Sequence, residues 1–223
     1  MKIHHRITSF SKFYYNDKGR SFIMLFPFLA IFLIFLLVLN LLRAKALRAE
    51  EEQEASFWER ESLANQTRKK DISNLPYVTL PLNDLPFGVC KLEECQEIEE
   101  KLISLSNDKI LKLSNLSNTD IKLKYGAANL PLLSKYDANF TELSNLIFRY
   151  GELLNENGFT KEAIQVLEYG VSIKTDMSKL FLLLAKLYCD TGQSEKITAL
   201  IEQTSCLSPL LQDSTTQQLK AML

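Results

Sequence analysis

The residue types best suited to chemistry in this 223-residue chain are its cysteines, histidines and carboxylates. Both histidines, His4 and His5, stand in the N-terminal tail, so the rest of the chain has no imidazole to act as a general base or a zinc ligand. The seven glycines are scattered singly, without the glycine-rich loop that cradles phosphate groups. No spacing in the sequence pairs two carboxylates. We therefore expect no enzyme, no cofactor and no metal site.

The four cysteines are Cys90, Cys95, Cys189 and Cys206. The first two have a C-x4-C spacing, which is too weak a pattern for a metal site. Outside the cell this pair could form a local disulfide, whereas a single helix carrying both would place the thiols poorly for bridging. The other two fall near opposite poles of a predicted helical hairpin. For them we expect no mutual disulfide and predict buried free thiols.

The longest apolar stretch, residues 22–42, is uncharged. As a helix it would be about 31 Å long, close to the ~30 Å hydrocarbon core of a bilayer. We predict a transmembrane helix over residues 21–42. A buried soluble helix would need a larger surrounding domain. A cleaved signal peptide is suggested by the Ala-Lys-Ala of residues 44–46, but the apolar run exceeds a usual signal sequence, and Arg43, Lys45 and Arg48 crowd the cleavage zone. An uncleaved signal-anchor is favoured.

Basic residues near the two ends of this stretch predict its orientation. Residues 1–20 carry five Lys or Arg, and the first residues after the stretch carry three. The tail 1–20 is therefore predicted to be cytoplasmic and the C-terminal domain to lie outside the cell membrane. No basic patch with interleaved aromatics follows, so nucleic-acid binding is not expected.

Three segments separate the membrane helix from the C-terminal part. Residues 43–72, rich in helix formers, predict a charged helical stalk, and their apolar positions keep no heptad that would support a coiled coil. Residues 73–90 contain Pro76, Pro81 and Pro86 and predict an extended segment packed on a surface. Residues 91–138 predict an irregular helical region that packs on the rest. It begins with an amphipathic helix over 91–105 and continues with short helical turns.

The C-terminal part, residues 139–223, contains an internal repeat. A shift of 34 residues aligns 144–175 with 178–209, placing Gly158 on Gly192 and Gly151 on Ala185. Each unit has two helix-length apolar patterns around a glycine turn. This layout resembles the tetratricopeptide (TPR) repeat, in membrane-anchored proteins of the kind found in Gram-positive bacteria. The second unit departs from the family pattern, with Ile197 where the first has Ala163.

The resemblance implies hairpins over 144–177 and 178–211, followed by a capping helix. It also implies that the first helices of the hairpins line a groove for a peptide or partner helix. An acidic or apolar partner segment would suit the groove, although the same positions also fit an ordinary solvated surface. The groove positions are Asn145, Phe148, Glu152, Asn155, Lys179, Leu182, Lys186 and Cys189.

The predicted fold is all-α, with one N-terminal transmembrane helix, a helical stalk and a small domain of TPR-like hairpins. The predicted function is that of a membrane-tethered scaffold that binds another protein and contacts the lipid bilayer through residues 22–42. The alternative is a structural subunit of a membrane complex, assembled through the transmembrane helix and stalk, in which the repeats serve only as packing.

Overall fold

The computed structural model describes residues 17–113 and 116–223, with side chains described from residue 28 onward. The predicted basic tail therefore lies largely outside the described residues. In the described part the chain is all-α, as predicted, and its one β feature is an isolated bridge between Val78 and Ile110. Two 3₁₀ turns, Ala127–Asn129 and Thr204–Cys206, accompany the α-helices. The α-helices are α1 (Asp17–Gln66), α2 (Glu93–Leu105), α3 (Asn118–Tyr125), α4 (Leu130–Glu156), α5 (Thr160–Ser172), α6 (Ser178–Asp190), α7 (Lys196–Gln203) and α8 (Pro209–Lys220).

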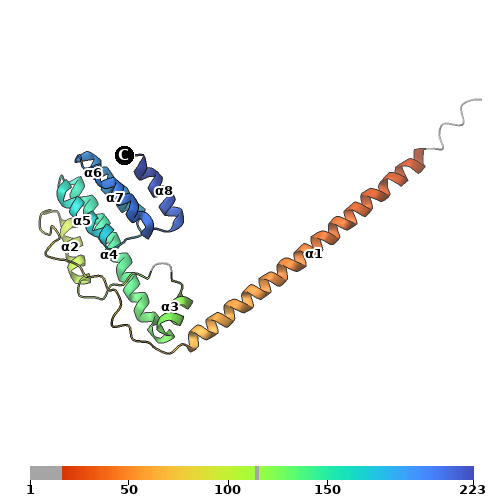
Figure 1. Ribbon diagram of the computed structural model, residues 1–223, viewed down its shortest axis with the longest axis horizontal. Coiled ribbons are helices and arrows are strands. Elements are labelled where there is room, and N and C mark those ends of the chain that lie inside the picture. The colour runs from red at the N-terminus through yellow and green to blue at the C-terminus, as the bar shows by residue number, and fades with distance from the viewer. Residues whose placement is uncertain (1–16, 114–115) are drawn as a thin grey trace, which may run out of the picture. The chain divides into compact units, whose positions relative to one another are not determined.

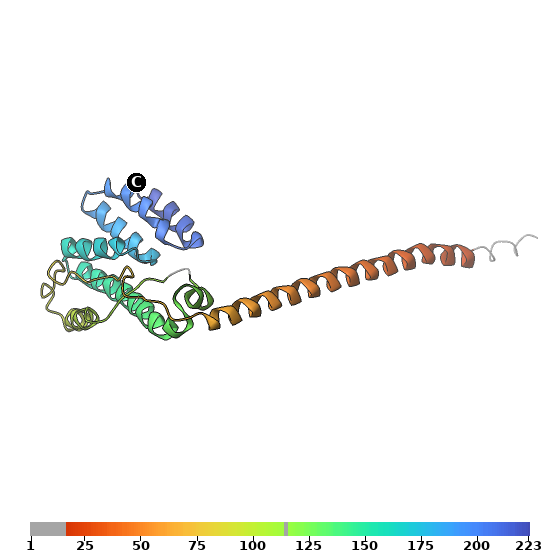
Figure 2. The same ribbon diagram turned by 60° about the horizontal axis from the view of Figure 1, so that its bottom comes forward.

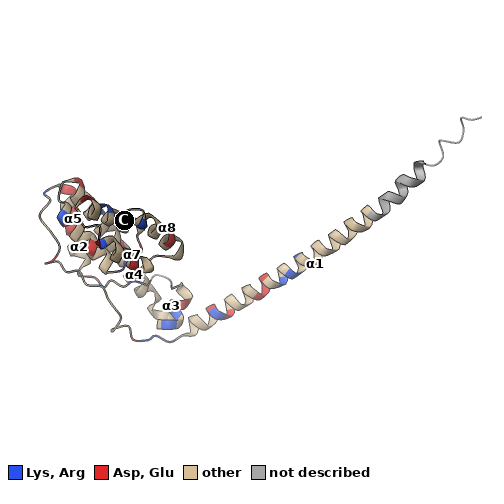
Figure 3. Ribbon diagram, turned by 45° about the horizontal axis from the view of Figure 1, so that its top comes forward, with Lys and Arg blue, Asp and Glu red and all other residues tan. Residues whose placement is uncertain are grey.

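The chain divides into two compact units, residues 1–62 and 63–223. In the first unit, α1 is one continuous helix through the predicted membrane segment and most of the predicted stalk. Its described apolar side chains from Phe28 to Leu42 are exposed, and an 18-residue window has a mean hydropathy of 2.2. The helix is long and apolar enough to cross a membrane. Figure 3 shows the described uncharged part of α1, followed first by basic and then by acidic residues.

The helix ends at Gln66, before the predicted end of the stalk at residue 72, because the next residues pair with another part of the chain. The Lys70 amide donates to the Tyr125 carbonyl at 3.0 Å, and the Ala127 amide donates to the Thr67 carbonyl at 3.2 Å. Gly126 has a φ of 94°, and a Cβ there would lie 2.3 Å from the Arg68 carbonyl oxygen. Only glycine allows the two backbone segments to approach this closely.

The proline-rich segment packs on the helical unit, as predicted, instead of forming a free linker. Leu85 and Cys90 are buried in the main hydrophobic core, and Val78, Leu80 and Phe87 pack against it. The amide of Val78 donates to the Ile110 carbonyl at 2.9 Å. Prolines keep the segment out of regular structure, while its apolar side chains hold it on the core.

Helix α2 confirms the amphipathic pattern predicted for residues 91–105, with Cys95, Ile98, Leu102 and Leu105 buried. The region that follows contains α3, which begins at a capping box between Ser117 and Asp120. Ile121, Leu123 and Tyr125 alternate in the sequence as residues of a strand would, but all three lie in this helix. Helix α4 begins at Leu130, well before the predicted first repeat at residue 144.

Helices α4 to α8 form two antiparallel hairpins and a final helix, which lie side by side in Figures 1 and 2. The turns between helices contain Gly158 (φ 84°) and Gly192 (φ 71°), in the left-handed region that glycine accepts without strain. Helix α5 packs on α4 and α6, α8 packs on α6 and α7, and α2 packs on α4. A Cβ on Gly151 would lie 2.7 Å from Leu167 Cδ2, so this glycine permits the close approach of α4 and α5.

Candidate protein-binding surfaces

The residues predicted to line a groove lie on two helices that contact each other, four on α4 and four on α6. Asn145, Lys179 and Lys186 are exposed. Phe148 and Leu182, the two large apolar residues among the groove positions, are partly buried and pack against the hydrophobic core. Much of their apolar surface is therefore already used inside the protein, which leaves less for a partner.

The remaining three groove residues contact neighbours within the unit. Glu152 accepts a hydrogen bond from Arg149 at 2.7 Å, and Asn155 Oδ1 accepts one from Thr160 Oγ1 at 3.3 Å. The Cys189 thiol donates to the Met222 carbonyl at 3.6 Å. Within the described residues, no hydrogen bond or ion pair joins the four positions on α4 to the four on α6. The predicted groove is thus a mixed surface with two exposed lysines, and not a continuous apolar channel.

A better-defined hollow lies between α5 and α7, the second helices of the two hairpins. Its volume is about 250 Å³. The residues that line it come from three helices, and Leu184, Leu200 and Val171 give it an apolar lining. An adjoining hollow of about 370 Å³ shares Val171, Ser172 and Gln203 with the first and is also lined by Lys174. The lining residues of the first are Glu168, Val171, Ser172, Leu184, Tyr188, Lys196, Ala199, Leu200 and Gln203.

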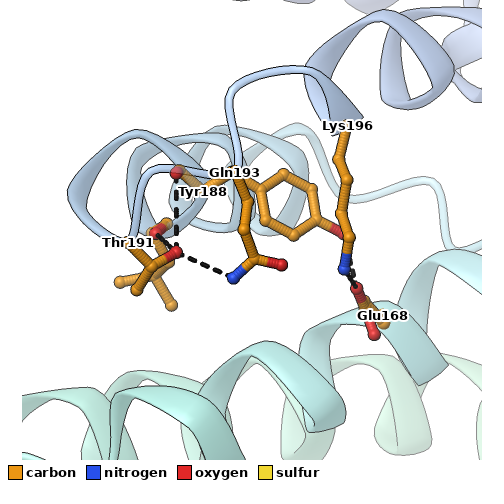
Figure 4. Close-up of polar contacts among 6 residues, drawn as sticks. Glu168, Tyr188, Thr191, Gln193 and Lys196 are labelled. Carbon is orange, nitrogen blue, oxygen red and sulfur yellow. Dashed lines mark hydrogen bonds and ion pairs between the residues drawn. The ribbon is translucent and has the colours of Figure 1, made fainter.

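Three polar side chains from α5, α6 and α7 meet at this hollow, as Figure 4 shows. Glu168 Oε1 accepts hydrogen bonds from the Tyr188 hydroxyl at 2.8 Å and from Lys196 Nζ at 3.0 Å. Lys196 Nζ also lies 5.1 Å from the centroid of the Tyr188 ring, within cation–π range. Burial and the hydrogen bond to Glu168 raise the pKa of Tyr188, so its phenol remains a donor at neutral pH.

A second pair of polar side chains in Figure 4 holds the turn between α6 and α7. The Thr191 hydroxyl donates to the Leu187 carbonyl at 2.7 Å, and Gln193 Nε2 donates to Thr191 Oγ1 at 3.0 Å. The turn delivers Lys196 to the first position of α7, opposite Glu168. The result is an apolar socket with an amine and a carboxylate at its edge. Such a socket suits an apolar side chain of a partner beside a charged group.

Sequence reasoning missed this hollow, because Glu168, Tyr188 and Lys196 have no spacing that points to a shared site. It also missed a buried polar cluster around Glu99. The Glu99 carboxylate accepts from the Tyr150 hydroxyl at 2.7 Å and from the Gly88 amide at 3.0 Å. A signal was available here, since Glu99 falls four residues after Cys95 and three before Leu102, on the apolar face of α2.

The cluster around Glu99 ties the proline-rich segment to α2 and α4. The Tyr150 oxygen also lies 2.9 Å from the Pro86 carbonyl oxygen. Burial, and next the hydrogen bond to Glu99, raise the pKa of Tyr150, so its proton remains available to the acceptors around it. With little solvent access, this cluster positions chain segments and offers no open site for a ligand.

The candidate binding surfaces are thus the hollow between α5 and α7, with the hollow that adjoins it, and the exposed mixed surface on α4 and α6. Neither brings together a nucleophile and a free base among the described side chains. The chain matches no protein-family model, and searches of the curated proteins and of the solved structures find no match either.

Proposed function

We propose that this chain is a membrane-anchored scaffold whose helical hairpins bind another protein. The observation that carries the proposal is the repetition of the hairpins. At a spacing of 34 residues, Gly158 and Gly192 both have a left-handed φ in the turns, and Gly151 and Ala185 are both buried. This arrangement resembles TPR repeats, whose general role is to hold peptides or partner helices.

In this proposal α1 crosses the cell membrane, with the N-terminus in the cytoplasm and the hairpins outside. The support is the length and hydropathy of α1, together with the excess of basic residues before its apolar part. The exposed apolar side chains from Phe28 to Leu42 would then face lipid. Anchoring by one end would keep the hairpins near the membrane surface.

We place the partner's main contact in the hollow between α5 and α7. No described side chain occupies its apolar lining, and the Glu168–Lys196 pair at its edge can reorganise around a charged group of the ligand. Lys179 and Lys186, on the groove face, would add attraction for an acidic segment.

The test is affinity capture of the tagged full-length chain from cross-linked, detergent-solubilised membranes. Ala199→Arg would fill the hollow, and Thr198→Arg is the matched control because Thr198 is exposed on the same helix but does not line the hollow. We expect Ala199→Arg to lose a partner that Thr198→Arg retains. The double substitution Lys179→Glu, Lys186→Glu tests the groove face in parallel.

Three outcomes separate the possibilities. Loss of the partner only in Ala199→Arg supports the hollow as the site. Loss of the partner only in the lysine double variant would indicate that the partner binds the surface on α4 and α6. A partner that survives all three variants, with the helical circular dichroism signal unchanged, would contradict binding by the hairpins.

A second function is favoured by one feature of α1. Phe57 and Trp58 are 55% and 60% exposed in the charged part of the helix, with ring centroids 5.4 Å apart in an edge-on arrangement. Exposed aromatics of this kind are enriched at protein interfaces. The chain would then be a structural subunit assembled through α1. Loss of the captured partner in Phe57→Ser, Trp58→Ser, with no effect of Ala199→Arg, would favour this function.

A further inference from the structure

Two cysteines meet where the proline-rich segment joins α2. Cys90 precedes the helix, and Cys95 is its third residue. Leu92, the residue before the helix, is extended (φ −69°, ψ 143°), so the chain turns between the two cysteines. The two cysteines are therefore not carried on one helix, and both are free, buried thiols in the same hydrophobic cluster. The geometric obstacle that a single helix would impose on bridging is absent.

Both thiols are enclosed by the core. Cys90 is 1% exposed and Cys95 is 0% exposed, and both belong to the main hydrophobic cluster. The other two cysteines have separate partners, because the Cys189 thiol donates to the Met222 carbonyl and the Cys206 thiol donates to the Thr175 carbonyl. A bridge within the chain would thus join Cys90 to Cys95, which are five residues apart and share one buried cluster.

We propose that Cys90 and Cys95 form an intramolecular disulfide in the native protein, made while the unit folds on the outer side of the membrane. This inference rests on the orientation proposed for α1, because structural disulfides persist in oxidising compartments. The bond would fasten the end of the proline-rich segment to the first turn of α2. It would close next to the Glu99–Tyr150 hydrogen bond, which ties the same segment to α4.

The reaction is thiol–disulfide exchange with an oxidised disulfide, either of a thiol oxidoreductase or of glutathione. One cysteine thiolate attacks that disulfide and forms a mixed disulfide, and the second cysteine then displaces the remaining thiol. The two cysteines lose two electrons and two protons in total, and the donor disulfide becomes two thiols. Burial, together with the hydrogen bond to Cys90, raises the pKa of Cys95 to about 12, so little thiolate exists once the unit has folded. The exchange would therefore take place during folding, and burial would then shield the finished disulfide from reductants.

The sequence provides a direct assay, because trypsin cuts after Lys91, between the two cysteines. Membranes of a bacterial host containing the full-length chain are denatured in N-ethylmaleimide, digested with trypsin and analysed by mass spectrometry. We expect peptides 71–91 and 92–101 to be recovered joined, and to separate after reduction. The peptides with Cys189 and Cys206 should carry N-ethylmaleimide and serve as internal controls. In Cys90→Ala, Cys95 should become alkylated.

A second measurement tests whether the disulfide can form independently of the membrane orientation proposed for α1. The purified full-length chain, unfolded and reduced in urea, is refolded in detergent with oxidised glutathione. We expect the joined peptides 71–91 and 92–101 here too, whatever side of the membrane the unit occupies in the cell. Alkylated Cys90 and Cys95 after this refolding would overturn the bridge itself. Joined peptides after refolding but alkylated cysteines in membranes would overturn the native disulfide, and protease digestion of intact cells then shows whether the orientation also fails.

Discussion

The hydroxyl of Tyr150 on α4 lies 2.7 Å from a carboxylate oxygen of Glu99 on α2, and both side chains are buried. The same carboxylate accepts the Gly88 amide at 3.0 Å, so three segments of the chain meet at one acidic group. A buried acceptor that loses a donor cannot recover it from water. This pair is therefore a sensitive position in the helical unit.

Tyr150→Phe removes the hydroxyl while leaving the ring in place. Since Glu99 would then lack one of its donors, we expect the free energy of unfolding to fall by about 1–3 kcal/mol. Urea unfolding of the full-length protein in detergent, followed by circular dichroism, measures this loss. Tyr169→Phe is the control, because its hydroxyl donates to the Thr79 carbonyl at 3.2 Å from a more exposed place. Equal losses in the two variants would contradict a special role for the Glu99 cluster.

Gly170→Ala should destabilise the contact between the hairpins. A Cβ at this position would lie 2.5 Å from Leu180 Cδ1 and 2.9 Å from Ile147 Cγ2, and both side chains are fully buried. Overpacking costs about 1–3 kcal/mol, which outweighs the roughly 1 kcal/mol that alanine gains over glycine in a helix. Thermal melting would show a lower midpoint than in Gly151→Ala, where the three atoms nearest to the added Cβ all belong to the single side chain of Leu167. An unchanged midpoint in Gly170→Ala would mean that Leu180 moves aside freely.

Alkaline pH should destabilise the folded unit. Burial raises the pKa of Tyr169 to about 12, and the pKa values of Tyr150 and Tyr188 are also raised. Tyrosines of the unfolded chain ionise near pH 10, so between about pH 10 and 12 the unfolded state has lost protons that the folded state keeps. Stability is therefore fully present below about pH 10 and falls as the pH rises above it. Absorbance at 295 nm, recorded with circular dichroism, measures both processes. Ionisation of every tyrosine near pH 10 with the helices intact would contradict this prediction.

Lys196→Gln should affect binding far more than stability. The Lys196 and Glu168 side chains are 44% and 42% exposed, and ion pairs at such positions contribute about 0–1 kcal/mol. The edge of the hollow between α5 and α7 would nevertheless lose its cation. Lys135→Gln is a matched control, because it breaks the exposed Lys135–Asp108 pair (3.3 Å) away from the hollow. Unfolding curves should agree for the two variants, while partner capture should fall only for Lys196→Gln. A similar loss of partner capture in both variants would show that Lys196 has no specific role in the binding site.

Periodicity predicted the helices well because burial on one face repeats along the chain. Helix α2 and the turns at Gly158 and Gly192 follow directly from apolar spacing and from glycine. The beginning of α4 was misjudged for a local reason. Pro131 suggests a turn in the sequence, but it lies in the first helical turn, where its missing amide is not needed. The TPR resemblance itself stays a prediction.

The binding surfaces were harder to predict, because periodicity shows which residues face a neighbour but not which neighbour covers them. Phe148 and Leu182 were among the predicted groove positions, and both are partly buried and pack against the core. The hollow between α5 and α7 depends on Lys196 and Glu168 approaching from separate helices. Such a meeting is a property of tertiary packing, and no local pattern of the chain encodes it.

The pairing of residues 67–70 with residues 125–129 has a mechanical consequence. Directly after the long helix, backbone hydrogen bonds join Lys70 to Tyr125 and Thr67 to Ala127, and Asn129 Nδ2 donates to the Lys70 carbonyl at 2.8 Å. No slack tether separates the helix from these bonds. Tension applied along α1 would therefore load this small group of hydrogen bonds first and together. A pull on α1 would thus reach these bonds before it reaches the hairpins that carry the proposed binding surfaces.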